Sequence, residues 1–440
     1  MKINFNNYKN LLKVTGLFTG VHGLNIVLNV SRNKIAALLI GPMGMGLASI
    51  YNETRELLHT MTNCGLDIAG IRGISQKVEQ LRNATDAESR RSIERDIDER
   101  VRLLRSWIVI FALFGTMFCL LLAEPISWLT FSDLDHIWGY VFLSPAVGLS
   151  TMTCGELTIL KATQRLKALA TVSVLNVALA IIIALPFYQL MGTDGILPAL
   201  VSLSLAQFCA TSCYSWRSHR PKFCFQRIYL RSGVPMMKVG IAFTLTNIVS
   251  HGAQLGIRAM LNDMAGGGDA GLAEVGYYSA AYSIAIVYGS VIFASLDNEF
   301  FPRLTGIFDN LEARRTAVWR QVRVSVLLAI PCAIGLVVLL PWILPILLTN
   351  EFGKAITMAQ FASVGIIFRA IYLPLAYIPL AAGHSRVFMS LEFLSYLVLF
   401  ISVLTGYRLG GLDGAGIALA VSIFIDMCII LSVAKIKYKV

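Results

Sequence analysis

Two apolar stretches of the sequence each carry a row of amide, imidazole and guanidinium side chains at helical spacing. The first row is His22, Asn25, Asn29 and Arg32, and the second is Asn247, His251, Gln254 and Arg258. Steps of three and four residues place each row on one face of a helix. A central arginine costs about 2.5–3.5 kcal/mol in a membrane helix, so each face is expected to line a bundle interior or a water-filled cavity. Guanidinium groups bind phosphate well, which makes both rows candidate substrate-binding surfaces.

Further charged residues lie inside apolar stretches. A third row, Asn52, Glu56, His59 and Asn63, has Arg55 and Asp67 beside it, and Arg369, Glu156, Glu392 and Asp426 lie in or near other stretches. We add Arg55 and Arg369 to the substrate-binding candidates. Asp67, Asp297 and Glu299 are further acidic residues in or near apolar stretches. The alternative is that these charges pair with one another, for example Arg32 with Glu53 or Glu56, and only hold helices together.

The composition indicates that these rows lie in a membrane. Of the 440 residues, 56% are hydrophobic and 14% are charged, whereas a soluble domain averages about 25% charged residues. This composition excludes soluble enzymes and nucleic-acid-binding proteins, despite the net charge of +11. Twelve segments of about 20 apolar residues, each long enough to cross a bilayer, can be placed. They lie near 15–41, 45–74, 106–130, 138–160, 168–190, 195–215, 236–262, 273–301, 324–348, 355–382, 387–407 and 413–434.

The distribution of Lys and Arg predicts the orientation. With the N-terminus in the cytoplasm, 28 of the 37 cations fall in cytoplasmic segments, and only Lys354 and Arg408 fall in outside loops. Positive charge accumulates on the cytoplasmic side of membrane proteins, so both termini are predicted to be cytoplasmic. The charged segment 76–105 is expected to form a cytoplasmic helix, and the outside loops are all short.

The two halves of the chain resemble each other in three places. The sequence GTDG at 192–195 matches GLDG at 411–414, and GLASIY at 46–51 resembles GLAEVGY at 271–277. PISW at 125–128 loosely matches PWIL at 341–344. The offsets are all near half the length, which predicts a parallel repeat of six helices. The expected fold is therefore an all-α membrane protein, with lobes 1–220 and 221–440 related by a pseudo-two-fold axis around a central cavity.

Catalytic, metal and cofactor signatures are missing from the sequence. The eight cysteines form no CxxC pair and no grouping with histidine at metal-ligand spacing. No GxxxxGK[ST], HExxH or GxSxG pattern occurs. We therefore expect a protein that is not an enzyme, with no metal, no cofactor and no nucleic-acid partner.

Four short segments resemble a known family. The segment 32–47, RNKIAALLIGPMGMGL, is similar to the corresponding part of bacterial O-antigen and lipid III flippases of the polysaccharide transporter family. The resemblance continues at EVGYY (274–278), FFPRLT (300–305) and LLTNEF (347–352), in the same order along the chain. These flippases belong to the multidrug/oligosaccharidyl-lipid/polysaccharide superfamily.

This resemblance implies a function. Such a protein moves undecaprenyl-diphosphate-linked oligosaccharide from the cytoplasmic to the periplasmic leaflet of the bacterial inner membrane by alternating access. Arg32, Arg258 and Arg369 would contact diphosphate or sugar acids, and the amides and histidines of the two rows would contact other polar groups. Asp67, Asp297 and Glu299 would be the candidates for coupling transport to protons or sodium ions. The implied partners are the lipid-linked substrate, membrane lipids, and a polysaccharide polymerase with its chain-length regulator.

Two alternatives remain open. A drug/cation antiporter of the same superfamily would favour an acidic, aromatic cavity, whereas the leading rows here end in arginine. An O-antigen polymerase would use the same lipid-linked sugar but is expected to have a long, basic outside loop, and the outside loops here carry only two cations.

Overall fold

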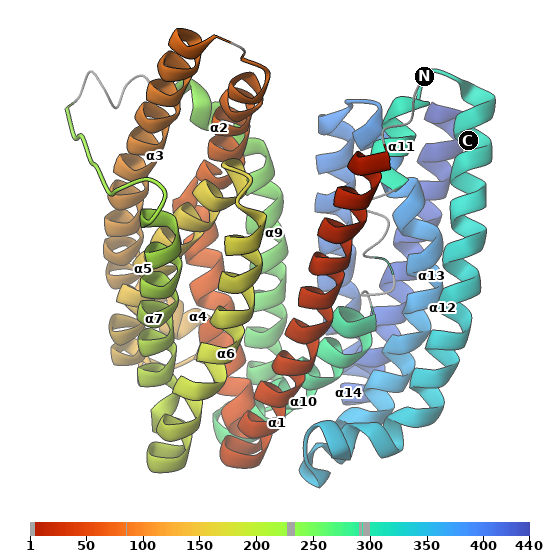
Figure 1. Cartoon of the computed structure of the whole chain (residues 1–440). Coiled ribbons are helices and arrows are strands. Elements are labelled where there is room, and N and C mark those ends of the chain that lie inside the picture. The colour runs from red at the N-terminus through yellow and green to blue at the C-terminus, as the bar shows by residue number, and fades with distance from the viewer. Residues whose placement is uncertain (1–4, 85, 227–233, 290–292, 294–299) are drawn as a thin grey trace. The chain divides into compact units, whose positions relative to one another are not determined.

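The computed structural model describes residues 5–84, 86–226, 234–289, 293 and 300–440, and its regular elements in these ranges are all helices (Figure 1). They are α1 (Phe5–Asn63), α2 (Leu66–Asn83), α3 (Ala87–Leu121), α4 (Ala123–Phe131), α5 (Ile137–Ala162), α6 (Leu166–Met191), η1 (Gly192–Gly195), α7 (Ile196–Trp216), α9 (Val234–Met264), α10 (Gly268–Tyr282), η2 (Ser283–Tyr288), α11 (Phe301–Gly306), α12 (Leu311–Leu347), η5 (Asn350–Lys354), α13 (Ala355–Ala381) and α14 (Ser385–Tyr438).

The helices are long and apolar enough to cross a membrane several times. Within the described ranges, seven helical stretches meet the length and hydropathy of a membrane span. Three of them, Gly23–Asn63, Leu166–Trp216 and Ser385–Tyr438, are much longer than one crossing needs. Each of these three contains a glycine that interrupts the helix, at positions 41, 192 and 411. If each break separates two crossings, and α9 supplies one more, the described helices account for eleven of the twelve predicted spans. The other predicted span, 273–301, lies partly outside the described residues.

The breaks repeat between the two halves of the chain. Gly41 has φ 61° and ψ −169°, and Gly267, about half the chain later, has φ 68° and ψ −170°. Gly192 and Gly411 form a second such pair, with φ 57° and ψ −128° against φ 59° and ψ −143°. Residues with a Cβ atom rarely adopt these conformations, so glycine is needed at each break. The equivalent backbone geometry supports the internal repeat predicted from the GTDG and GLDG sequences.

The chain divides into two compact units. Unit 1 contains residues Met1–Leu39, Tyr51–Trp128 and Asp133–Ile248, and unit 2 contains Ile40–Ile50, Leu129–Ser132 and Val249–Val440. Two short segments from the first half of the chain therefore pack with the second half. The lobe boundary at residue 220 stays a prediction.

In unit 1, α3 packs against α2 and α5, and α7 packs against α5 and α6. The segment 76–105, predicted as one helix, instead contains the end of α2, a turn and the start of α3. Asp86 begins α3 by accepting a hydrogen bond from the Ser89 amide at 3.2 Å, which is typical of a helix N-cap. Lys77 of α2 bridges to Asp96 of α3 at 2.8 Å. The prediction of a single helix was wrong because no glycine or proline marks the break between α2 and α3 in the sequence.

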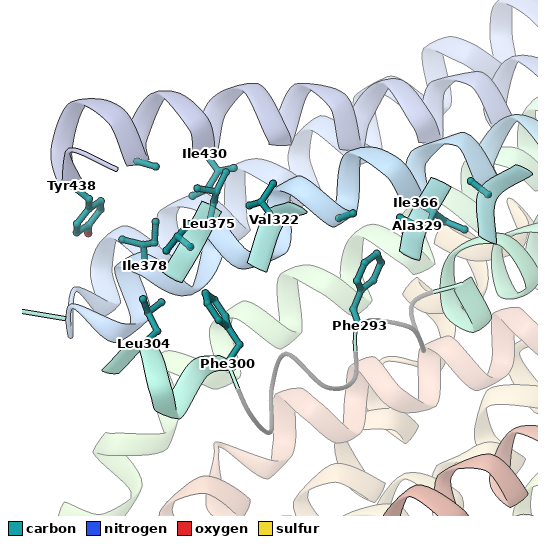
Figure 2. Close-up of a cluster of buried hydrophobic side chains, with 14 residues drawn as sticks. Phe293, Phe300, Leu304, Val322, Ala329, Ile366, Leu375, Ile378, Ile430 and Tyr438 are labelled. Carbon is teal, nitrogen blue, oxygen red and sulfur yellow. The ribbon is translucent and has the colours of Figure 1, made fainter. Parts of the chain in front are cut away.

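In unit 2, α13 lies against α12, α14 and α10, and its buried face carries small and apolar residues. Figure 2 shows the apolar cluster that holds these helices together, with Leu304 of α11, Val322 of α12, Leu375 of α13 and Ile430 of α14. Phe293 also contributes its ring to this cluster. The cluster fixes α13 and α14, which carry the polar residues described below.

Candidate functional site

The first polar row lies on α1 and faces α6 in unit 1. Asn25 donates a hydrogen bond from Nδ2 to Ser173 Oγ at 2.8 Å, and Asn29 donates to the Asn25 carbonyl oxygen at 2.8 Å. Arg32 is exposed and interacts electrostatically with Tyr188 of α6. The side chain of His22 lies outside the described part of the structure. The described members of this row therefore follow one helix face, as the spacing predicts.

The third row, on the second half of α1, faces α5 and α7. Arg55 is buried and donates to Glu56 Oε1 at 2.6 Å and to Ser204 Oγ of α7 at 3.3 Å. His59 shares a hydrogen bond of 3.1 Å with Thr151 of α5. Glu56 thus forms an ion pair with an arginine, as expected if the intramembrane charges pair with one another. Its partner is Arg55, whereas the pairing suggested from the sequence was with Arg32.

The second row lies on α9, and its arginine is held in place by polar neighbours. Arg258 is 7% exposed and donates from Nη1 to the Gln254 carbonyl oxygen at 2.8 Å and to Gln254 Oε1 at 3.1 Å. Its Nε donates to Ser279 Oγ of α10 at 3.3 Å, and Ser279 in turn donates to Ser49 Oγ at 3.0 Å. On the same helix, Asn247 is exposed and His251 is half-buried.

Arg369 joins the same network in unit 2 from α13. It interacts electrostatically with Glu392 and Tyr396, both on α14. Tyr396 also interacts electrostatically with Tyr282, and the Tyr282 hydroxyl accepts a hydrogen bond from Gln254 Nε2 at 2.9 Å. Polar side chains of α9, α10, α13 and α14 therefore lie in the same region of unit 2. Arg258 and Arg369 both belong to this polar region, and their role in substrate binding stays a prediction.

Several residues of this network were not among the predicted site residues. The Tyr372 hydroxyl donates to Glu392 Oε1 at 3.4 Å, and Ser395 hydrogen-bonds to Asp426. Glu392 and Asp426 stand out in the sequence as intramembrane acids, but tyrosine is too common in membrane helices to attract attention. A signal was available in the helical spacing, because Tyr372 follows Arg369 by three residues and Tyr396 follows Glu392 by four.

The coupling candidates are only partly described. Asp67, at the start of α2, accepts a hydrogen bond from Asn63 Nδ2 at 3.2 Å and lies near Cys154 of α5. Asp297 and Glu299 lie outside the described residues. Within the described residues, no group of three or more His, Cys, Asp or Glu side chains is arranged to hold a metal ion.

A second buried ion pair lies in unit 1, between Arg105 and Glu156. The sequence analysis had placed Arg105 in the charged cytoplasmic segment. Arg105 is 2% exposed, and its Nε and Nη2 donate to the two carboxylate oxygens of Glu156 on α5, each at 2.8 Å. Glu156 also accepts hydrogen bonds from Ser215 and from Trp216 Nε1 of α7. Arg105 was counted with the charged segment because it ends a run of charged residues. The structure shows that it fixes α3, α5 and α7 to one another.

The site in unit 2 can serve two kinds of chemistry. An arginine held by amide and hydroxyl groups is already oriented, so it loses little side-chain entropy when it binds an anion. Carboxylates flanked by tyrosine rings suit cations instead. The network contains both kinds of group, since Arg258 and Arg369 are cationic and Glu392 is acidic.

Comparisons with known proteins give a family and a fold. A family model described as "Polysaccharide biosynthesis protein" matches residues 94–357. A search of the curated proteins found no match. Among solved structures, an inward-facing multidrug resistance MATE family transporter of the MOP superfamily matches with a TM-score of 0.73 at 13% identity, covering 94% of this chain and 96% of the other.

Two further structures have the same fold. The lipid II flippase MurJ in an inward closed conformation matches with a TM-score of 0.71 at 13% identity, covering 95% of this chain and 87% of the other. A MOP superfamily transporter from Pyrococcus furiosus, described as having a binding pocket of reverse polarity, matches with a TM-score of 0.66 at 11% identity, covering 97% and 96%. The predicted all-α fold, with twelve helices in two lobes, is confirmed.

Proposed function

Because the chain belongs to the polysaccharide biosynthesis protein family, we propose that it is a flippase for undecaprenyl-diphosphate-linked oligosaccharide, such as an O-antigen repeat unit. The substrate moves from the cytoplasmic to the periplasmic leaflet of the bacterial inner membrane, and both chain termini lie in the cytoplasm. The likeness of the fold to transporters and a flippase supports transport rather than enzymatic activity.

The polar network of unit 2 is the observation that carries this proposal. A diphosphate and its glycan cannot cross hydrocarbon unless polar groups replace their water. Arg258 and Arg369 supply positive charge for the diphosphate, and Gln254, Tyr282 and Tyr396 supply hydrogen-bonding groups beside them. The polyprenyl tail needs no such groups and stays in lipid. In unit 1, Arg32, Arg55, Asn25 and Asn29, with His22, form the corresponding candidate surface, and Asn247 and His251 extend the row on α9.

The two lobes alternate between states open to each side of the membrane, and an ion gradient drives the cycle. Asp67 is the described candidate for coupling, with Asp297 and Glu299 as further candidates. If Asp67 binds the coupling proton, Asp67→Asn removes the pH dependence of transport while the protein still folds. Unchanged pH dependence in this variant would exclude Asp67 from coupling. A polysaccharide polymerase and a chain-length regulator act on the substrate after it has crossed.

The test is the sidedness of lipid-linked repeat units in cells that lack the gene and other flippases able to replace it. Cells are complemented with wild type, with Arg258→Ala and Arg369→Ala together, or with Arg315→Ala. Arg315 lies exposed on α12, outside the polar network, and is the control for loss of an arginine that does not belong to the network.

We expect repeat units to accumulate in the cytoplasmic leaflet of the deletion strain and of the double variant, at normal protein levels. Wild type and Arg315→Ala restore their transfer. The proposal fails if repeat units reach the periplasm in the deletion strain but stay unpolymerised, because the protein then acts after translocation.

A drug/cation antiporter is the second candidate, and the carboxylates of unit 2 favour it. Glu392 accepts a hydrogen bond from Tyr372, and Asp426 lies on the other half of α14, near Glu392. An acidic, aromatic surface of this kind binds organic cations. If this activity is the main one, deletion sensitises cells to cationic drugs without changing the sidedness of lipid-linked sugars, and Glu392→Gln reproduces that sensitivity.

A further inference from the structure

The segment that follows α7, residues 217–226, is fixed to α3 through its backbone. Arg105 Nη1 donates to the carbonyl oxygens of His219 at 2.8 Å and of Arg220 at 3.1 Å. Farther along, the Cys224 amide donates to Ser106 Oγ at 2.9 Å. Because Glu156 holds the Arg105 guanidinium with two further hydrogen bonds, the segment is attached to a buried and rigid group.

Most of the exposed side chains of this segment are cationic or aromatic, the exceptions being Pro221 and Gln226. Arg217, Arg220 and Lys222 are exposed. Phe223 and Phe225 are 42% and 55% exposed, and their rings stack with centroids 6.3 Å apart and planes 5° apart. Residues two apart in an extended chain point to the same side, so both rings share one side and Cys224 faces the opposite way. Two exposed phenylalanines beside three cations are costly in water but suit a membrane surface.

The attachment points place the segment at the boundary of the membrane. Ser106 lies where the charged part of α3 ends and its apolar run begins with Trp107. Trp216 ends α7 immediately before the segment. Tryptophan and tyrosine gather where membrane helices meet lipid headgroups. The backbone bond to Ser106 therefore holds Phe223 and Phe225 near the level of the headgroups, where α3 enters the hydrocarbon.

We propose that residues 217–226 form a binding surface for anionic phospholipids. Arg217, Arg220 and Lys222 contact the phosphate groups of the lipids, and Phe223 and Phe225 insert between the upper acyl chains. The segment precedes α9, so this contact would anchor the connection between the two halves of the chain to one leaflet. Charge complementarity selects an anionic lipid, because neutral lipid headgroups offer no net attraction to three cations.

Lipid binding can be tested on the purified full chain in detergent by native mass spectrometry. Dioleoylphosphatidylglycerol and dioleoylphosphatidylcholine are added together, and the ratio of the two lipids retained on the protein is measured. The test variant is Arg217→Gln/Arg220→Gln/Lys222→Gln. The matched control, Arg90→Gln/Arg91→Gln/Arg95→Gln, removes three exposed cations from the start of α3. All six positions are exposed, so both variants are expected to fold.

We expect the test variant to lose at least about tenfold in its preference for phosphatidylglycerol, since each cation near an anionic surface contributes roughly fivefold. The control variant keeps the preference of the wild type. Equal preferences in all three proteins, or equal losses in both variants, would overturn the proposal. In the first case the surface does not select anionic lipid, and a protein partner becomes the better occupant.

A second measurement uses wild type in nanodiscs and does not depend on any substitution. Trypsin cleaves after Arg217 and Lys222 in the segment, and after Arg90 and Arg91 in α3, which serve as an internal reference. We expect nanodiscs containing phosphatidylglycerol to slow cleavage in the segment by about fivefold or more relative to phosphatidylcholine nanodiscs, and salt to reverse this protection. Equal protection in the two lipids would contradict the proposal.

Discussion

Two buried arginines of unit 1 differ in how far their carboxylate partners are withdrawn from solvent. The Arg105–Glu156 pair has side chains 2% and 7% exposed, whereas Arg55 and Glu56 are 11% and 33% exposed. A charge that loses its partner inside a protein keeps the full cost of leaving water, and a partly exposed charge recovers some hydration. The two pairs therefore contribute to stability in different ways.

Glu156→Gln is expected to lower the free energy of unfolding by about 3–5 kcal/mol, because it leaves the Arg105 charge buried without its partner. Glu56→Gln, the matched change at the more exposed pair, is expected to have a clearly smaller effect. The measurement is the temperature at which each detergent-solubilised variant loses its monodisperse peak in size-exclusion chromatography. Equal shifts for the two variants would show that burial does not set the strength of these pairs.

His219 lies in the 217–226 segment, and the ionisation of its ring is expected to make the stability of the fold depend on pH. Burial lowers the pKa of His219, and the nearby Asp98 carboxylate, 3.6 Å away, opposes this only in part. Because the folded-state pKa lies below the unfolded value of about 6.5, the unfolded chain binds a proton first as the pH falls. The contribution of His219 to stability is therefore present above pH 6.5 and decreases below it.

We expect the melting temperature of wild type to fall between pH 7.5 and pH 5.5 more steeply than that of His219→Gln, which cannot titrate in this range. Other groups change the stability of both proteins equally, so the difference between the two curves isolates His219. Parallel curves would mean that His219 ionises equally in the folded and unfolded chain.

At the scale of elements, α1 and α10 cross through two glycines in unit 2. A Cβ atom at Gly46 would collide with the Leu272 carbonyl oxygen, and one at Gly276 would collide with the Pro42 carbonyl oxygen. The Ser49–Ser279 hydrogen bond of 3.0 Å lies beside this crossing and continues to Arg258. The close approach of the helices thus also positions the arginine of the candidate site.

Gly46→Ala and Gly276→Ala are each expected to force α1 and α10 apart, at a cost of about 1–3 kcal/mol. Weaker packing increases local opening of helices, so hydrogen–deuterium exchange should become faster in peptides covering 42–50 and 272–280. Gly252→Ala on α9 is the control, because a Cβ atom there meets no atom within 4 Å. Unchanged exchange in the crossing peptides of both test variants would mean that the helices adjust without separating.

Much of the element structure could be predicted from the sequence, because long apolar runs and the repeated GTDG and GLDG sequences are strong signals. The twelve spans follow from the first signal and the halved organisation from the second. The break between α2 and α3 could not be placed, since no glycine or proline marks it in the sequence. The crossing of α1 and α10 could not be predicted from the sequence either, because the close approach of Gly46 and Gly276 depends on tertiary packing.

The candidate site was predictable only for residues that are unusual inside a membrane. Arg258 and Arg369 attract attention because charge in hydrocarbon is expensive. Tyr282 and Tyr396 do not attract attention, since tyrosine is an ordinary residue of membrane helices and only the fold places these two near the arginines. Arg105 was assigned to the charged cytoplasmic segment because many of its neighbours in the sequence are charged, although its side chain is buried in the structure.

At the scale of the whole molecule, the two halves of the sequence do not coincide with the two compact units. Unit 2 includes Ile40–Ile50 and Leu129–Ser132 from the first half, and unit 1 extends to Ile248 in α9. A half that is cut at residue 220 therefore lacks segments with which its own helices pack. In particular, fragment 221–440 lacks Gly46, and Leu272 and Gly276 of α10 pack against Gly46 in the intact chain.

Fragments 1–220 and 221–440 are accordingly expected to form a stable complex when expressed together and to aggregate when expressed alone. The measurement is recovery of an untagged fragment through a tag on the other, followed by size-exclusion chromatography of each preparation. A cut at 220 removes one covalent connection, but the Gly46 crossing and the Asn262–Thr130 hydrogen bond of 3.4 Å can form again between fragments. If both fragments are monodisperse alone and do not co-purify, the exchanged segments are dispensable, and each half is an independent folding unit.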